Sequence, residues 1–447
     1  MGLTLTEASK RFIEKFKTSG EVTRENKNYI PGGYSRDAVT YGPHPIYIDH
    51  GEGQYLYTVD GHRLLDFHNN FTVSILGHNH PAIREALLQN IPKGFSFGNP
   101  MKHEGKLAKI LIERIESVDR VVFTCSSSEA CIAAARLGRA YTGKNKIAKF
   151  EGGYHGMGND FIFSLLPFPH MLPGHPSNPV PVPLTNGTPT FVRDNVVILP
   201  QNDIASCKRI LTQNVKDIAC LFMELQTSAG FMVTYGKEFV QALRELTEDV
   251  GIVLIFDETI NLRTNYHGMQ HLYDVKTDLT VMGKTIGGGM PLGAVGGSEK
   301  FMQMNEQHMV WHSGTHHGHP LSCIAGAACM EVLDNAAIER LNGFGEKIKK
   351  ELNEWARGKN YPFFIHGVGS HLGYEFPDQL NREYKSVRDI LTYSDEAKMQ
   401  TFAIEMANRG IFPFYRGQIA LSVPMTEEDI GTLIKMTKEI VQDILEP

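Results

Sequence analysis

The chain has 447 residues, more than one hydrophobic core usually organises, so its length predicts two structural domains. Hydrophobic residues make up 42% and charged residues 21%, which excludes a mostly disordered chain. The formal net charge of -6 argues against a protein that binds nucleic acid by neutralising phosphates.

We expect no membrane span, because no stretch approaches the roughly 20 apolar residues that a span needs. The N-terminus is charged and lacks the apolar core of a signal peptide. None of the six cysteines forms a CxxC pair, so a disulfide framework is not expected. These features predict a cytoplasmic protein with reduced thiols.

The first 116 residues predict helices at both ends and a strand pair between them. Apolar side chains recur at helical spacing over residues 4–18 and again over residues 102–116. Residues 46–67 alternate between apolar and polar side chains on both sides of Asp60-Gly61, which is typical of a β-hairpin.

From about residue 120 the chain alternates between short apolar runs and helix-like segments. This alternation predicts a mainly parallel sheet whose strands are buried by helices on both faces. The Pro-rich residues 167–190 interrupt the pattern and predict an active-site or interface loop. The apolar runs begin at residues 121, 146, 195, 219, 251 and 279, and the chain continues with a helix over 320–333, a strand at 419 and a helix from 427.

Polar residues follow several of these predicted strands, at the sheet edge where ligands bind in such folds. The small hydroxyl residues at 126–128 open a helix whose free N–H groups suit a phosphate, although an ordinary helix cap has the same pattern. Tyr154 follows a glycine pair, so its ring can lie on a flat ligand or can simply pack in a glycine turn.

Two charged residues end neighbouring predicted strands. A buried carboxylate at Asp257 is costly unless a helix N-terminus or a positive ligand group meets it. Burial of Lys284 would lower its pKa and make the amine a nucleophile, although a single such lysine can also be structural. A phosphate, a ring with a basic nitrogen and an aldehyde occur together in pyridoxal 5′-phosphate (PLP), which we therefore predict as the cofactor.

The sequence closely resembles the class III aminotransferases, which are fold-type I PLP enzymes, from about residue 29 to residue 440. Within them it is most similar to the branch of the glutamate-1-semialdehyde aminomutases, which also contains β-amino-acid and D-phenylglycine aminotransferases. The resemblance is strongest in LGHNHP (76–81), GGYHG (152–156), FDE (256–258), GKTIGGGMPLGAVGG (283–297) and GTHHGHPLSCIAGAACMEVL (314–333).

The resemblance implies an α/β fold with a large domain around a mainly parallel seven-stranded sheet and a smaller α+β domain. The smaller domain would combine the two ends of the chain. We therefore expect residues 1–75 and 331–447 in the small domain and residues 76–330 in the large, PLP-binding domain.

The resemblance also assigns roles by position. Lys284 would be the Schiff-base lysine, and Asp257 would pair with the pyridine nitrogen. Thr315 matches a threonine that reaches the cofactor of the neighbouring subunit, which implies a homodimer. The other implied cofactor-binding residues are Ser127 and Ser128 in a phosphate cup, Tyr154 stacked on the ring with His155 beside it, and Glu224 behind the cofactor.

The sequence departs from the family pattern at the border of the expected pocket. The family's NSGTEA reads CSSSEA, so Ser127 replaces a glycine at the phosphate cup. Glu224 is not followed by the family's proline, and Thr259 stands where an aliphatic residue usually packs on the ring. The segment DETINLR is one residue shorter than usual. Because these departures border the pocket and remove no catalytic group, the resemblance indicates the cofactor more firmly than the substrate.

Two arginines are candidates for the substrate carboxylate. Arg36 ends PGGYSR, which resembles the segment that binds this carboxylate in β-amino-acid and D-phenylglycine aminotransferases. Arg416 lies where the same group can place a second arginine. A guanidinium holds a carboxylate by two parallel hydrogen bonds, but either arginine could instead form a surface or interface ion pair.

Four histidines between residues 312 and 319 invite a metal site. We expect none, because no carboxylate or cysteine pattern in the sequence completes a ligand set, and Thr315 inside the cluster already has an implied role. The histidines are His312, His316, His317 and His319.

The sequence thus predicts a PLP-dependent aminotransferase that moves an amino group from an amino-acid-type substrate, such as a β-amino acid, to a keto acid. Its partners would be small-molecule amines and keto acids and a second copy of the chain. A 2,1-aminomutase of the glutamate-1-semialdehyde type and an amino-acid racemase or epimerase remain alternatives.

Overall fold

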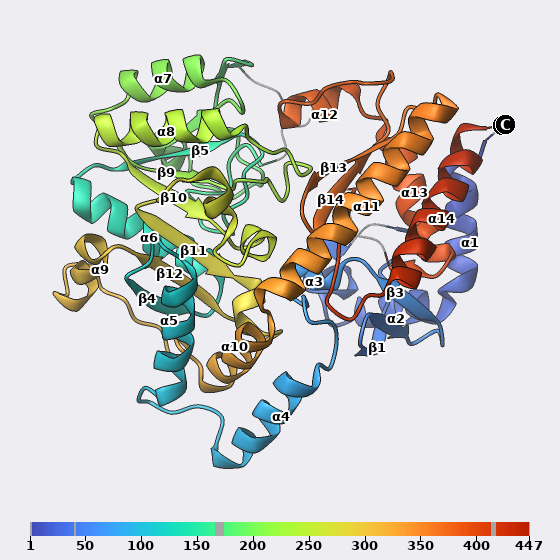
Figure 1. The fold of residues 1–447 in the computed structure, drawn as a ribbon, viewed down its shortest axis with the longest axis horizontal. Coiled ribbons are helices and arrows are strands. Elements are labelled where there is room, and N and C mark those ends of the chain that lie inside the picture. Colours follow the sequence, from blue (N-terminus) through green and yellow to red (C-terminus); the bar gives the residue numbers. More distant parts are fainter. Residues whose placement is uncertain (1, 40–41, 166–173, 413–416, 447) are drawn as a thin grey trace. The chain divides into compact units, whose positions relative to one another are not determined.

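The structure is a computed structural model that describes residues 2–39, 42–165, 174–412 and 417–446. The chain divides into two compact units. Unit 1 comprises Met1–His80, Glu339–Glu383 and Tyr393–Pro447, and unit 2 comprises Pro81–Ile338 and Tyr384–Thr392 (Figure 1).

A seven-stranded sheet forms the centre of unit 2. Its strand order is β4-β12-β11-β10-β9-β5-β8, and β12 alone is antiparallel to its neighbours in this sheet. The predicted α/β class with a mainly parallel seven-stranded sheet is confirmed. The strands are β4 (Arg120–Thr124), β5 (Lys146–Phe150), β8 (Val196–Leu199), β9 (Ile218–Met223), β10 (Val253–Asp257), β11 (Leu279–Gly283) and β12 (Gly293–Gly297).

Strand β12 is the one that the apolar runs did not reveal. Its sequence is GAVGG, so it lacks the side chains that mark a buried strand. Close neighbours require its glycines: a Cβ on Gly293 would lie 2.3 Å from the carbonyl group of Ser126, and a Cβ on Gly296 would lie 2.6 Å from a methyl carbon of Val118. The same close packing brings the start of helix α6 (Ser127–Thr142) against the sheet.

Helices cover both faces of this sheet, and the strand side chains alternate between two hydrophobic clusters. Val281 belongs to the cluster with α6 (Ser127–Thr142), whereas Met282 belongs to the cluster with α5 (Lys102–Arg114) and α10 (Pro320–Val332). Every side chain of β10 and β11 is buried, which explains their continuous apolar runs. The remaining α-helices of unit 2 include α4 (Pro81–Asn90), α9 (Glu299–Glu306), and α7 (Ile204–Gln213) beside α8 (Lys237–Asp249) (Figure 1).

Unit 1 is an α+β unit built from both ends of the chain, as the resemblance implied. One sheet has the order β1-β2-β3-β15 and another the order β13-β14-β16. Helix α1 (Leu5–Lys15) packs against α13 (Glu396–Asn408). The strands are β1 (Ile48–Glu52), β2 (Tyr55–Thr58), β3 (Arg63–Asp66), β13 (Phe364–Val368), β14 (His371–Glu375), β15 (Ile411–Phe412) and β16 (Gln418–Ala420); the other long helices are α2 (Lys17–Asn26), α14 (Glu427–Leu445) and α11 (Asn335–Lys359), whose first turn belongs to unit 2.

The predicted helix over residues 4–18 is two helices. Phe16 leaves the helical region with φ -108° and ψ 44°, so α1 ends at Lys15 and α2 begins at Lys17. In the part of the chain that the structure describes, no single helix is both long and apolar enough to cross a membrane. One bent pair, α10 with α11, meets those criteria by length and composition when the two helices are taken together.

The packing of α10 against the turn that begins at Lys284 can be tested with two glycines, Gly326 in α10 and Gly343 in α11. A Cβ on Gly326 would lie 2.1 Å from the backbone oxygen of Ile286, in the 3-10 turn η8 (Lys284–Gly287), whereas a Cβ on Gly343 would meet nothing within 4 Å. We expect Gly326→Ala to lower the free energy of unfolding by about 2 kcal/mol, because the added methyl group overpacks this contact. Gly343→Ala should raise the free energy of unfolding by roughly 0.5–1 kcal/mol, because alanine has the higher helix propensity. Thermal unfolding midpoints measure both, and a rise for both variants would contradict the α10–η8 contact.

Candidate active site

Asp257 is the last residue of β10, and its side chain is only 3% exposed. Its Oδ2 lies 2.9 Å from His155 Nδ1, and its Oδ1 accepts the Thr259 N–H at 3.1 Å. Burial by itself raises the pKa of this carboxyl, but the hydrogen bonds from His155 and Thr259 outweigh burial and hold the pKa below its ordinary value. Asp257 therefore carries a negative charge beneath the surface of unit 2.

The side chain of His155 contacts Asp257, a contact that its sequence position next to Tyr154 does not reveal. Its side chain is buried, with its ring 5.4 Å from the ring of Phe222 and 6.0 Å from that of Phe161. Burial lowers the pKa of His155, so the neutral imidazole donates its Nδ1–H to Asp257. The Asp257 contact is the role of His155 that the geometry supports, and sequence reasoning missed it. A direct contact with the cofactor remains a prediction.

Lys284 directly follows β11, the strand next to β10, with Asp257 in register with Val281. Its backbone has φ +50°, a left-handed conformation that a lysine rarely adopts and that tends to occur at functional sites. Burial lowers the pKa of its amine to about 8, although the charges of Glu224 and Asp257 oppose this shift. A substantial fraction of the Lys284 amine is therefore neutral and nucleophilic near neutral pH.

Glu224 follows β9 and fixes the loop that carries Tyr154. Its Oε2 accepts the Tyr154 N–H at 2.8 Å, and its Oε1 accepts the Ser228 N–H at 3.2 Å. Burial, and then the charge of Asp257, raise the pKa of Glu224 to about 8. The two carboxyl groups thus differ in protonation near neutral pH: Asp257 is ionised and Glu224 is largely protonated.

The N-terminus of α6 forms a cradle beside these groups. Ser126 caps the helix by accepting the Glu129 N–H at 3.3 Å, so the first turn offers the backbone N–H groups of Ser127 and Ser128. Glycines line the cradle: a Cβ on Gly156 would lie 2.3 Å from Ser128 Oγ, and one on Gly283 would lie 2.9 Å from Ser127 Cβ. This arrangement suits a phosphate.

Most of the predicted cofactor residues lie at one edge of one sheet, at or just beyond the carboxyl ends of β4, β5, β9, β10 and β11. Thr315 lies in an exposed segment before α10. Arg416 lies outside the described residues. The residues that the fold brings to this edge are Ser127, Ser128, Tyr154, His155, Glu224, Asp257, Thr259 and Lys284.

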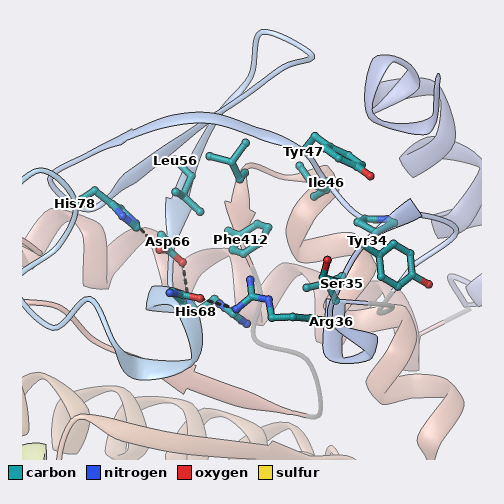
Figure 2. A pocket seen from close by; sticks show the side chains of 14 residues that line it. Tyr34, Ser35, Arg36, Ile46, Tyr47, Leu56, Asp66, His68, His78 and Phe412 are labelled. Carbon is teal, nitrogen blue, oxygen red and sulfur yellow. Dashed lines mark hydrogen bonds and ion pairs between the residues drawn. The ribbon is translucent and has the colours of Figure 1, made fainter. Parts of the chain in front are cut away.

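Arg36 belongs to unit 1, where it lines a pocket of about 450 Å³. Figure 2 shows its side chain reaching across this pocket toward His68, with Phe412 on the neighbouring wall. Arg36 Nη1 donates to Asn70 Oδ1 at 3.0 Å, and the guanidinium lies 5.3 Å from the centre of the Phe71 ring. Among the described residues, Arg36 forms no ion pair.

The histidine cluster needs a correction. Contrary to the sequence argument, both a carboxylate and a cysteine come close to it: Glu129 Oε2 lies 3.3 Å from His317 Nε2, and Cys125 completes a group whose ligand atoms are within 4.8 Å of one another. Glu129 also accepts the Cys125 N–H at 2.8 Å, so contacts among protein groups already account for this cluster. The absence of a functional metal site remains a prediction.

Lys149 is a buried lysine that the motifs did not single out. It is 0% exposed on β5, and its Nζ donates to the Phe163 carbonyl oxygen at 2.6 Å. Burial lowers its pKa to about 7, whereas the charges of Glu224 and Glu151 oppose the shift. The sequence feature that could have revealed this residue is the position of Lys149 inside the apolar run KIAKF, where a buried strand is expected.

The residues at this edge fit PLP. A buried anion at Asp257 suits a protonated ring nitrogen, a low-pKa amine at Lys284 suits the aldehyde, and the α6 cradle suits the phosphate. The buried Thr259 Oγ1 has no hydrogen-bond partner among the described residues, so a polar ligand group would satisfy it. Fold and site together define a fold-type I PLP enzyme.

Comparison with known proteins agrees with this class. The sequence profile described as "Aminotransferase class-III" matches residues 37–434. The glutamate-1-semialdehyde 2,1-aminomutase of Heliobacterium modesticaldum is 33% identical, over 96% of this chain and 97% of its own length.

Two solved structures superpose over nearly the whole chain. A transaminase with PLP bound has a TM-score of 0.87 at 31% identity and covers 96% of this chain and 98% of its own. A β-phenylalanine aminotransferase from Variovorax paradoxus has a TM-score of 0.86 at 29% identity, with coverages of 98% and 96%. The chain belongs to the class III aminotransferase family, and its cofactor is PLP.

The lowered pKa of Lys284 predicts the pH at which its amine reacts. Only the neutral amine is nucleophilic, so labelling of Lys284 by an amine reagent in cofactor-free protein should rise through about pH 8, below the ordinary lysine value of 10.5. Mass spectrometry measures the labelling, with the exposed Lys276 as internal reference. In Asp257→Asn the midpoint should fall further, because a neighbouring negative charge that favours the protonated amine is lost. A midpoint near 10 would contradict the burial of this amine.

Proposed function

We propose that this enzyme is an aminotransferase that moves an amino group from a carboxylate-bearing amine, with β-amino acids favoured, to a keto acid. The observation that carries the proposal is the placement of the Lys284 amine, whose pKa is low, and the buried anion Asp257 at the ends of the adjacent strands β11 and β10. The enzyme class follows from the family, whereas this particular reaction is our inference.

Each catalytic group has one task in this proposal. When bound, PLP supplies a carbonyl group that accepts the substrate nitrogen and a ring that withdraws electrons. The Lys284 amine would hold the cofactor, and the same amine, when free, would take the proton from the substrate carbon that bears the nitrogen. Asp257 would keep the ring nitrogen of the cofactor protonated, because its negative charge favours the cation. His155 keeps Asp257 ionised by donating a hydrogen bond.

Tyr154 and the phosphate cradle would orient the cofactor. We propose that the Tyr154 ring lies on the cofactor, with its loop held by Glu224. Ser127 and Ser128 would bind the phosphate through the first turn of α6. The unpartnered hydroxyl of Thr259 would add a polar contact where the family has an aliphatic residue.

The proposed substrate class rests on Arg36. Its guanidinium is bonded to an amide rather than a carboxylate, and its pocket also has apolar walls that include Ile46, Leu56 and Phe412. Such a pocket suits a carboxylate attached to an apolar group. The similarity to a β-phenylalanine aminotransferase supports the same substrate class. Arg416 stays a second candidate by resemblance only.

We further propose a homodimer in which Thr315 reaches the cofactor of the neighbouring subunit. Thr315 is exposed, and large apolar side chains are exposed near it in sequence: Met309 is 62% and Trp311 is 72% exposed. Unit 2 also exposes Phe95 and Met157, at 60% and 66%. Exposed apolar groups of this size favour an interface with another chain.

A 2,1-aminomutase is the second candidate, because curated relatives with that name match almost the full chain. A racemase or epimerase would use the same Lys284 and Asp257 but retain the amino group. An aminotransferase needs a keto acid for repeated turnover, whereas neither of these alternatives does.

Keto-acid dependence separates these reactions. With β-phenylalanine as substrate, we expect product to stop at one equivalent per site without a keto acid, and to accumulate when 2-oxoglutarate or pyruvate is added. Chromatography of products and of substrate enantiomers measures this. Repeated turnover without a keto acid would instead identify a mutase or racemase. Lys284→Ala should lower turnover by at least about 100-fold, since it removes the proton-transferring amine.

Arg36→Gln tests the substrate class. We expect KM for β-phenylalanine to rise roughly 30- to 100-fold, because two charge-assisted hydrogen bonds are lost. An amine without a carboxylate, such as 1-phenylethylamine, should react as it does in the parent enzyme. Steady-state kinetics with both amines measures the difference, and an unchanged KM for β-phenylalanine would remove Arg36 from the substrate site.

A further inference from the structure

The turn opposite Arg36 has an unusual backbone. Four consecutive residues other than glycine have positive φ angles: Asn69 (+50°), Asn70 (+49°), Phe71 (+55°) and Thr72 (+72°). Asparagine tolerates this left-handed region, but a bulky aromatic and a β-branched residue do not adopt it without strain. A conformation of this kind persists only where the surrounding structure enforces it.

Hydrogen bonds within unit 1 hold the start of this turn. Asp66 Oδ1 accepts the N–H groups of His68 and Asn69 at 2.8 and 2.9 Å, and His78 Nε2 lies 2.7 Å from Asp66 Oδ2. Asn69 Nδ2 donates to the Ala420 carbonyl oxygen in β16 at 2.7 Å. Asp66 and Asn69 are both 0% exposed, so these bonds are protected from water.

The turn presents Asn70 and Phe71 to Arg36. Asn70 Oδ1 accepts one N–H of Arg36 Nη1 at 3.0 Å, and the Phe71 ring centre lies 5.3 Å from the guanidinium carbon. A guanidinium has five N–H donors in a fixed plane, so one bond to a rigid acceptor and one aromatic contact restrict its orientation. The acceptor is a neutral amide, which leaves the positive charge of Arg36 uncompensated by this contact.

We propose that Asn70 is a positioning residue that selects for carboxylate-bearing substrates. From the left-handed turn it holds the Arg36 guanidinium in the pocket without neutralising it, so that the remaining donors meet the substrate carboxylate. This inference rests on the proposed role of Arg36. An aspartate at position 70 would supply the same acceptor but would pair with Arg36 and exclude a second carboxylate.

The test compares Asn70→Gly and Asn70→Asp with Arg36→Gln and the parent holoenzyme. Glycine adopts positive φ freely, so Asn70→Gly removes the amide without straining the turn. Asn381→Gly is the matched control, because Asn381 is exposed, has φ +57° and does not line the pocket. The binding probe is 3-phenylpropanoate, which carries a carboxylate but no amine, measured by titration calorimetry. The kinetic probes are β-phenylalanine and 1-phenylethylamine.

We expect Asn70→Gly to weaken 3-phenylpropanoate binding about three- to tenfold, the effect of one orienting hydrogen bond. Asn70→Asp should weaken it roughly 30-fold or more, because the charge of Arg36 is neutralised. In both variants KM for β-phenylalanine should rise while kcat and the reaction of 1-phenylethylamine stay unchanged. Asn381→Gly should match the parent.

The outcomes separate this inference from the proposed function. Loss of binding in Arg36→Gln, with parental binding in both Asn70 variants, would overturn the role of Asn70 and leave Arg36 as the carboxylate ligand. Parental binding in Arg36→Gln would overturn the role of Arg36 and, with it, that of Asn70. Equal losses for both amines in the Asn70 variants would also overturn it, because selection for carboxylates would be absent.

Discussion

The buried negative charge of Asp257 is the constraint on which the active-site region depends. A carboxylate at 3% exposure is strongly destabilising unless donors surround it. His155 and the Thr259 N–H are those donors, and His155 is itself fixed by aromatic neighbours. The surrounding hydrophobic residues therefore do more than fill space: they keep the imidazole neutral and oriented, and the imidazole in turn keeps Asp257 ionised.

That one charge sets the protonation of its neighbours. It raises the pKa of Glu224 beyond the effect of burial, so Glu224 is largely protonated near neutral pH. It also opposes the loss of the Lys284 proton, so that the Lys284 amine titrates near 8 instead of lower. The site thus combines one lasting anion with two groups that change protonation within the physiological range. Groups of this kind are what proton transfer to and from carbon requires.

Left-handed backbone occurs in each unit at a residue or turn to which we assign a role. In unit 2, Lys284 has a left-handed backbone, and the glycines of β12 let the sheet approach the phosphate cradle. In unit 1, the left-handed turn at residues 69–72 holds the partners of Arg36. In unit 1, hydrogen bonds to Asp66 and Ala420 hold this unfavourable local conformation, and the Arg36 side chain gains a defined direction.

The sequence by itself determined the class of fold and the cofactor chemistry. Buried strands such as β10 and β11 are marked by continuous apolar runs, and Asp257 and Lys284 stand directly at their ends, so local pattern was sufficient. It did not reveal β12, whose glycines leave no hydrophobic signal. The tertiary structure alone decided that His155 supports Asp257, that Lys149 is buried, and that Asn70 faces Arg36. His155 and Asp257 are 102 residues apart in the sequence, and Arg36 and Asn70 are 34 residues apart. Contacts over such separations depend on how elements pack, which residue type and spacing do not encode.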